Sequence, residues 1–153
     1  MSNLSIAESL ASAPEEERQK ILSELSEEEH RKLLYDWQFW ARPKQFIPEG
    51  DWYVWLVLAG RGFGKTRIGA EQIRRWQEQG YKRFGLVGQT PAEVRDVMVE
   101  GDAGILACSS PDNYPKYEPT KRRLTWSNGA TAIAYSAENP EVLRGPQHEK
   151  VWL

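Results

Sequence analysis

A glycine-rich segment that ends in lysine and threonine is the part of this sequence best suited to chemistry. It follows the apolar run 53–58, precedes a helix-like stretch, and reads Ala59, Gly60, Arg61, Gly62, Phe63, Gly64, Lys65, Thr66. Its glycines let the backbone turn sharply and direct several N–H groups toward phosphate oxygens. Lys65 supplies an ammonium for the β- and γ-phosphates, and Thr66 supplies a hydroxyl for Mg²⁺. The segment predicts a phosphate-binding loop between a strand and a helix, and hence a nucleotide-binding protein.

One position departs from the general pattern G-x-x-x-x-G-K-S/T, because Ala59 stands where that pattern has glycine. A glycine-rich surface turn is the alternative interpretation. The preceding apolar run, the additional glycines and the following helical stretch favour the phosphate-binding loop.

Length and composition narrow the class of protein. The chain has 153 residues, enough for about one domain with a real core. The longest apolar run, residues 52–59, is too short to cross a bilayer, and the N-terminus lacks the features of a signal peptide. We therefore expect a cytoplasmic protein with no membrane partner. Cys108 is the only cysteine, which excludes an intrachain disulfide and a cysteine-based metal site.

Charge is unevenly distributed along the chain. Residues 1–36 contain four Lys/Arg and nine Asp/Glu, a net of −5, whereas residues 37–153 contain sixteen and thirteen, a net of +3. The basic clusters are Arg74-Arg75, Lys82-Arg83 and Lys121-Arg122-Arg123. They can contact a phosphate backbone or simply lie on solvated faces, so charge alone does not decide the partner.

The first 50 residues predict a helical arm and a loop. Residues 12–36 form one or two short amphipathic helices, with capping-box spacing at Ser12/Glu15 and at Ser26/Glu29. Residues 37–50 are rich in aromatic residues and interrupted by prolines, which favours an extended loop.

The remainder predicts an α/β fold. Residues 53–58 are expected to form a strand, 66–79 a helix, 84–88 a buried strand and 90–101 a helix that begins at Thr90-Pro91. Residues 109–119 form a loop, and Asn128-Gly129 predicts a two-residue turn in a β-hairpin between 123–126 and 130–135. A helical turn at 139–145 and a strand beginning at 150 follow. Alternating strands and helices are typical of a parallel sheet with helices on its faces.

Taken as a set, these residues resemble the N-terminal ATPase domain of the large terminase subunit of tailed bacteriophages, the motor that packages DNA into the capsid. The likeness covers about residues 33–153. Five blocks carry it in the same order, and they are residues 41–45, 59–66, 90–101, 117–126 and 136–148. In this family the first loop position is often not glycine, which accommodates Ala59. The resemblance implies a P-loop NTPase fold of the ASCE/RecA-like class, with a mainly parallel sheet, flanking helices, an inserted β-hairpin and the N-terminal helical arm. Residues 1–36 are then the acidic arm and residues 37–153 a partial ATPase domain.

The resemblance also assigns roles to residues. Gln45 matches the family's adenine-reading glutamine, whose amide can both donate to and accept from the base, so the implied nucleotide is ATP with Mg²⁺. A solvent-exposed loop glutamine is the alternative. Trp37, Phe39 or Trp40 can stack on the base, although core packing is the better expectation for each.

Two arginines match catalytic positions of the family. The counterpart of Arg61 contacts the γ-phosphate or the groups that sense it, where a guanidinium stabilises transition-state charge. Arg144 resembles the arginine that some terminases insert into a neighbouring subunit's ATP site. The alternatives are a surface arginine for Arg61 and an arginine that braces its own loop for Arg144.

One family motif lies outside the sequence. An aspartate for magnesium and a glutamate that activates water are expected directly after a strand such as 151–153, and the coupling motif and the nuclease domain come later still. The chain by itself is therefore expected to bind nucleotide with little or no turnover.

The leading hypothesis is an ATP-driven motor at the procapsid portal in the host cytoplasm. Its implied partners are double-stranded DNA, the portal protein, the small terminase subunit and further copies of itself in a ring. A helicase-like P-loop NTPase is the enzymatic alternative. A nucleotide-dependent assembly module without catalysis is the non-enzymatic one.

Overall fold

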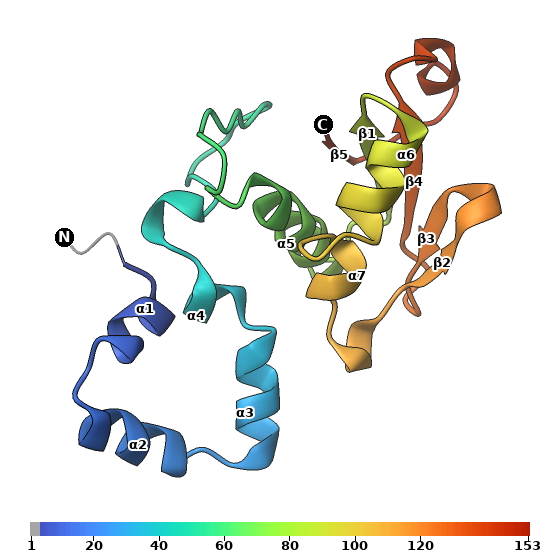
Figure 1. Cartoon of the computed structure of the whole chain (residues 1–153). Coiled ribbons are helices and arrows are strands. Elements are labelled where there is room, and N and C mark those ends of the chain that lie inside the picture. The colour runs from blue at the N-terminus through green and yellow to red at the C-terminus, as the bar shows by residue number, and fades with distance from the viewer. Residues whose placement is uncertain (1–3) are drawn as a thin grey trace. The chain divides into compact units, whose positions relative to one another are not determined.

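The computed structural model describes residues 4–153 (Figure 1). The chain divides into two compact units, residues 1–57 and 58–153, which are described separately. The first unit contains the predicted arm, residues 1–36, together with the residues up to Val57 that follow it.

Short helices make up the first unit. They are α1 (Ile6–Ala11), α2 (Glu15–Ser23), α3 (Glu27–Leu34), α4 (Trp37–Trp40) and the 3₁₀ turn η1 (Pro43–Gln45). Helical structure in the arm is thus confirmed. Among the described residues, α1, α2 and α3 bury none of their side chains, so the apolar stripe of the arm is not packed into a core of its own.

The two predicted capping boxes have different outcomes. Ser26 and Glu29 form the predicted box, in which the Ser26 hydroxyl accepts from the Glu29 N–H and the Glu29 carboxylate accepts from the Ser26 N–H. The Ser12/Glu15 box is wrong, because Pro14 occupies the N-cap of α2 and Ser12 ends α1 instead. A box that the sequence interpretation missed joins Ser5 and Glu8 at the start of α1.

The second unit is an α/β fold. Its helices are α5 (Lys65–Glu78), α6 (Pro91–Glu93), which continues into the π-helical segment η2 (Val94–Val99), and α7 (Ile105–Cys108). Its strands are β1 (Arg83–Gly88), β2 (Lys116–Glu118), β3 (Arg123–Thr125), β4 (Thr131–Ser136) and β5 (Lys150–Trp152). The 3₁₀ turns are η3 (Pro111–Asn113), η4 (Pro119–Lys121) and η5 (Pro140–Leu143). Thr90 caps α6 as predicted, since its hydroxyl accepts from the Glu93 N–H.

The five strands form one sheet in the order β2-β3-β4-β1-β5. β1 is parallel to β4 and to β5, whereas β3 is antiparallel to β2 and to β4. The expectation of a mainly parallel sheet is therefore wrong, and the sheet is mixed. The predicted hairpin, 123–126 with 130–135, forms as β3 and β4, but it is part of the main sheet, because β4 also pairs with β1 and β3 also pairs with β2.

The turn between β3 and β4 contains three residues rather than the predicted two. The Trp126 N–H donates to the Ala130 carbonyl at 2.9 Å, which leaves Ser127, Asn128 and Gly129 in the turn. Only Gly129 has a positive φ, at 82°. A two-residue type I′ turn requires positive φ at both central residues, and Asn128 does not adopt it.

The apolar run 53–58 does not form the predicted strand. The side chains of Tyr53, Val54, Leu56 and Leu58 are exposed, and Tyr53 is fully so. A strand forms only where a neighbour supplies hydrogen bonds to its backbone. Within residues 4–153 no strand lies beside this run.

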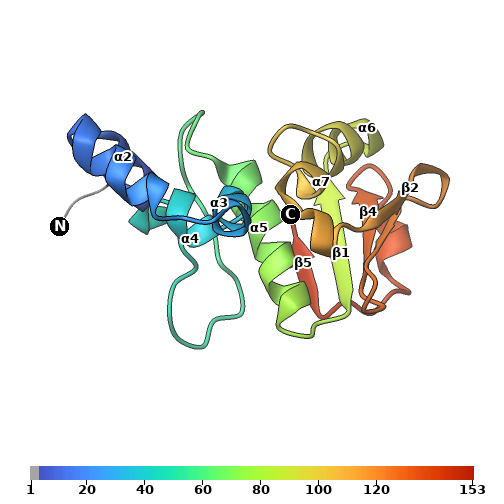
Figure 2. The same ribbon diagram turned by 90° about the horizontal axis from the view of Figure 1, so that it is seen from below.

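The core of the second unit lies between the helices and one face of the sheet. It joins Ala70 and Ile73 of α5 to Phe84 and Leu86 of β1, together with residues of η2, α7 and β4. Figure 2, a view from below, shows α5 and α7 beside the strands. On the other face, His148 from the segment between β4 and β5 packs against Gly85, where a Cβ atom would lie 3.2 Å from the imidazole.

Candidate nucleotide-binding site

The predicted phosphate-binding loop is a tight turn that leads directly into α5. Gly62 and Gly64 adopt the left-handed conformation, with φ of 80° and 92°. Such angles are strained for any residue with a side chain, so the turn depends on glycine at both positions. The third glycine of the loop, Gly60, has no left-handed φ. The sharp turn therefore uses the freedom of glycine at two of the three positions, and phosphate binding by the loop amides stays a prediction.

The N-terminal end of α5 is left without a side-chain cap. Gly64 is its N-cap residue and makes no side-chain hydrogen bond, and the first turn contains no acidic residue. By contrast, Ser5, Ser26 and Thr90 each cap their helices with a hydroxyl. The first amides of a helix have no partner within the helix and carry its positive dipole end. In α5 these amides are therefore suited to hold an anion.

Lys65 folds back over the loop. Its Nζ donates to the carbonyl oxygens of Ala59 and Gly60, both at 2.9 Å. The exposed ammonium is therefore held against the backbone at the start of the loop. Thr66 follows in the first turn of α5, partly buried. The Lys65 ammonium thus lies at the glycine-rich loop, and the role of Thr66 toward Mg²⁺ stays a prediction.

Arg61 lies at the exposed tip of the turn. Among the described residues it forms no ion pair. The position agrees with either interpretation of Arg61, a ligand for phosphate or a surface arginine.

Arg144 lies elsewhere in the second unit. Its guanidinium forms an ion pair with Glu141 at 2.8 Å, and its side chain is 78% exposed. The segment that carries it, drawn in red after β4, lies away from the beginning of α5 in both views (Figures 1 and 2). The structure does not bring Arg144 to the phosphate-binding loop of its own chain.

Gln45 belongs to the first compact unit, whereas residues 59–66 belong to the second. Its side chain is buried, with 7% exposed. The amide oxygen accepts from the backbone N–H of Arg42 at 2.8 Å and from its Nε at 3.5 Å. The alternative of a solvent-exposed glutamine is therefore wrong, while the adenine-reading role stays a prediction.

A buried ion cluster behind the loop was missed by the sequence interpretation. The Glu71 carboxylate accepts hydrogen bonds from Arg67 Nε at 2.8 Å and from Arg74 Nη1 at 2.7 Å. The Glu71 side chain is 3% exposed. Burial raises the pKa of the Glu71 carboxyl, while Arg74 and Arg67 act in the opposite direction. The i, i+4 and i, i+3 spacing of the three residues was the available signal. The cluster holds the first three turns of α5, which begin at the loop.

Cys108 of α7 lies close to this cluster. The residue is fully buried, and burial raises the pKa of its thiol to about 12. A thiol with so high a pKa is neutral at physiological pH and a poor nucleophile. This environment is that of a structural cysteine in the core.

The last strand packs tightly on α5. The indole of Trp152 in β5 lies against Gly69, one turn inside the helix, so that a Cβ atom at this glycine would overlap the ring. β5 is parallel to β1, and its carboxyl end is thus held beside the N-terminal half of α5. Within the described residues, no group of three or more His, Cys, Asp or Glu side chains is arranged to hold a metal ion.

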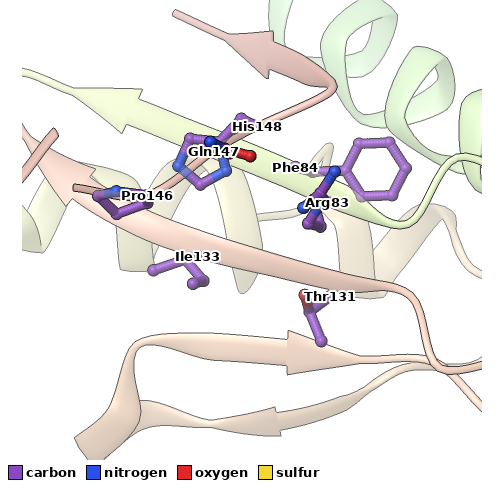
Figure 3. Close-up of a pocket in the computed structure, with 7 residues that line it drawn as sticks. All are labelled: Arg83, Phe84, Thr131, Ile133, Pro146, Gln147 and His148. Atoms are coloured by element: carbon purple, nitrogen blue, oxygen red, sulfur yellow. The ribbon is translucent and has the colours of Figure 1, made fainter. Parts of the chain in front are cut away.

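A hollow on the other face of the sheet has different chemistry. It measures about 380 Å³ and its lining includes Arg83, Thr131, Ile133 and His148 (Figure 3). The His148 ring stacks edge-on against Tyr135, with ring centroids 5.2 Å apart. Burial lowers the pKa of the His148 imidazole, and the charge of Arg83 lowers it further. This hollow contains none of the predicted site residues.

Comparison with known proteins gives one positive result. A family model described as "Terminase large subunit, T4likevirus-type, N-terminal" matches residues 56–153, which is more than half of the chain. No curated protein matches the chain. No solved structure matches it either. Within residues 4–153 there is also no helix of the length and apolarity needed to cross a membrane. The family match spans the glycine-rich loop, α5 and all five strands, and the chain belongs to this family of terminase large subunits.

Proposed function

We propose that this chain is the ATP-binding part of a motor that drives double-stranded DNA into a viral procapsid. Family membership supports the role in DNA packaging. The observation that carries the ATP-binding proposal is Lys65, whose ammonium is held against the loop carbonyls of Ala59 and Gly60, beside two left-handed glycines and the uncapped start of α5. Backbone amides, a helix dipole and an ammonium that converge on one point are what a triphosphate requires.

In this proposal the loop amides of residues 60–66 hold the phosphates and Thr66 contributes a hydroxyl to Mg²⁺. When bound, the magnesium ion would neutralise charge on the phosphate oxygens. Lys65 would turn from the Ala59 and Gly60 carbonyls toward the β- and γ-phosphates. Gln45 is proposed to read the adenine, and its burial supports a fixed orientation of the amide.

The test is a titration of Mg²⁺ and a non-hydrolysable ATP analogue into the chain by calorimetry. Lys65→Ala should weaken binding by at least about tenfold, since a charge-assisted hydrogen bond contributes roughly 1.5–3 kcal/mol. Lys20→Ala, which removes the same charge from an exposed position in α2, should bind like wild type. Equal affinity of Lys65→Ala and wild type would overturn the proposal.

Gln45→Ala belongs in the same titration. If Gln45 reads adenine, this variant should lose the preference for the ATP analogue over the GTP analogue. A variant that binds both analogues as wild type does would remove Gln45 from the site and leave the phosphate-binding loop in place.

Hydrolysis is a separate proposal. The chain by itself should turn over ATP no faster than Lys65→Ala, because no carboxylate of residues 58–153 is assigned to activate water. A longer protein that continues beyond Leu153 should hydrolyse ATP. Turnover by the chain alone above the Lys65→Ala control would refute this.

Arg144 is proposed to act on a neighbouring subunit. Its side chain is mostly exposed and is tethered only to Glu141 on its own loop, which supports a residue that can reach outward. In the longer protein, Arg144→Ala and Lys65→Ala subunits would each be inactive alone. Partial recovery of ATPase activity on mixing them is the expected result, and complete absence of recovery would place Arg144 outside the neighbour's site.

The remaining partners are the portal protein and the small terminase subunit. We infer that the acidic arm docks on one of them, because its net charge is −5 and α2 and α3 leave their apolar side chains unburied. Deletion of residues 1–32 should abolish capture of that partner. Unchanged capture of both would count against the arm as the docking segment.

A further inference from the structure

One hairpin of the second unit is rich in positive charge for its length. This hairpin, residues 116–125, contains Lys116, Lys121, Arg122 and Arg123 but only Glu118 as an acid, a net of +3. The whole segment 37–153 also has a net of +3. The hairpin is thus one of the basic stretches of the second unit, and residues 61–83, with a net of +5, are another.

Its cations are only partly neutralised by ion pairs. Glu118 is shared between Lys121, at 2.7 Å, and Arg123, at 3.5 Å. Among the described residues, Lys116 and Arg122 form no ion pair, and both are exposed. The hairpin therefore presents two unpaired cations and two that share one carboxylate.

Arg122 has an unusual backbone conformation. It is the only non-glycine residue in the described chain with a positive φ, at 51°. Its N–H donates to the Pro119 carbonyl at 3.0 Å, and its carbonyl accepts from the Ala134 N–H at 2.9 Å. This conformation favours glycine or asparagine over arginine. The two hydrogen bonds thus fix a strained turn that holds an arginine side chain outward.

A hollow of about 410 Å³ opens beside Arg122, and Arg95 and Tyr117 also line it. Arg95 is already paired with Asp96, Nε to Oδ1 at 2.6 Å. Arg122 is therefore the cation of this hollow that is available to an anion, with the Tyr117 ring beside it.

We propose that the β2–β3 hairpin contacts the phosphate backbone of duplex DNA, with unpaired Arg122 as the principal phosphate ligand and exposed Lys121, which would exchange its surface contact with Glu118 for a phosphate, as the second. This inference rests on the proposed function, which supplies DNA as the partner. Lysine on an edge strand also prevents pairing with other chains, and that role accounts for Lys116 in β2. It does not account for Lys121 and Arg122, which lie in the turn beyond the strands, at the end of the hairpin that projects from the sheet (Figure 1).

The test is binding of the full chain to a fluorescently labelled 30-base-pair duplex, measured by anisotropy over a series of salt concentrations. Lys121→Ala/Arg122→Gly should bind at least about tenfold more weakly, and the slope of log K against log salt should fall by about 2, because each lost phosphate contact removes about one unit of slope. Glycine at position 122 suits the left-handed backbone, so the thermal midpoint of this variant should not fall. Arg122→Lys, which keeps the charge, should retain most of the binding.

A control variant separates this surface from charge in general. Lys20→Ala/Arg75→Ala removes the same two charge types from exposed positions on α2 and α5, and should bind DNA as wild type does. Equal weakening by both double variants, or no weakening by the hairpin variant, would overturn the proposal. Competition by polyglutamate as effective as competition by unlabelled duplex would also overturn it and indicate an acidic protein partner.

Titration of the ATP analogue into the same variants tells the two proposals apart. If all variants bind the analogue but the hairpin variant keeps its DNA affinity, only the hairpin assignment fails. If wild type does not bind the analogue, the proposed function fails, whatever the DNA measurement gives.

Discussion

Gly69 in α5 lies directly against the indole of Trp152 in β5, with no side chain between helix and strand. The contact fixes the short strand β5, which has only three residues, to the helix that begins at the phosphate-binding loop. A displacement of β5 should therefore also displace the N-terminal half of α5, and a displacement of α5 should displace β5.

Gly69→Ala should destabilise the second unit. The new Cβ atom would overlap the Trp152 ring, and overpacking of this kind costs about 1–3 kcal/mol. The free energy of unfolding in urea measures the effect. Gly145→Ala is the matched control, because no atom lies within 4 Å of a Cβ built there and its φ is not positive. If both variants are equally stable, Trp152 does not pack on α5 as described.

Glu71→Gln should also destabilise the protein. It removes the negative partner of Arg67 and Arg74, and breaking a buried ion pair costs about 3–5 kcal/mol when the opposite charge stays behind. Glu78→Gln provides the comparison, since its exposed carboxylate is 3.6 Å from Arg74 and its loss should cost no more than about 1 kcal/mol. Unfolding free energies that rank Glu78→Gln as the more damaging change would contradict the cluster.

His148 should make the stability of the protein depend on pH. Burial and then Arg83 lower the pKa of its imidazole below the ordinary value of 6.5 in the folded state. The folded protein thus prefers neutral His148, so this contribution is complete above pH 6.5 and is lost as the pH falls through the lowered pKa. The thermal midpoint of wild type should decrease between pH 7 and pH 5 more than that of His148→Phe, which keeps an aromatic ring against Tyr135. Parallel curves for the two proteins would argue against a partly buried imidazole at this position.

Substitutions in the loop should affect ligand binding more than folding. Gly64→Ala places a side chain at φ 92° in the N-cap of α5 and should cost about 1–2 kcal/mol in strain. It should also weaken binding of the ATP analogue, because the loop amides no longer point to one place. Gly60→Ala, at a position without positive φ, should cost less on both measures. If Gly60→Ala weakens binding of the ATP analogue more than Gly64→Ala does, the turn does not have the conformation described above.

The sequence predicted the elements whose signals are local. The helix expected at 66–79 is α5, which runs from Lys65 to Glu78, and the buried strand at 84–88 is part of β1. Glycine at the end of a helix, a hydroxyl cap and a continuous apolar run act within a few residues, so they can be recognised without the rest of the fold.

The parts that failed depend on distant partners. Residues 53–58 have the apolar composition of a strand, but pairing requires a neighbour that composition does not reveal. The mixed sheet follows from β3 joining β4, a choice that the Asn128-Gly129 signal does not specify. The Ser12/Glu15 box failed because Pro14 determined where α2 begins. In the site, the turn at residues 59–66 could be predicted because its residues are adjacent in sequence, whereas the spacing of Arg67, Glu71 and Arg74 does not reveal that Glu71 is buried.

The central claim is that the amides of residues 60–66 enclose a polyphosphate, and amide chemical shifts measured by NMR test it most directly. Addition of Mg²⁺ and a non-hydrolysable ATP analogue to the labelled chain should move the signals of Gly60 to Thr66 more than any others, and Lys65→Ala should abolish the change. Shifts that are largest elsewhere, for example around His148, or no shifts at saturating analogue, would contradict the account.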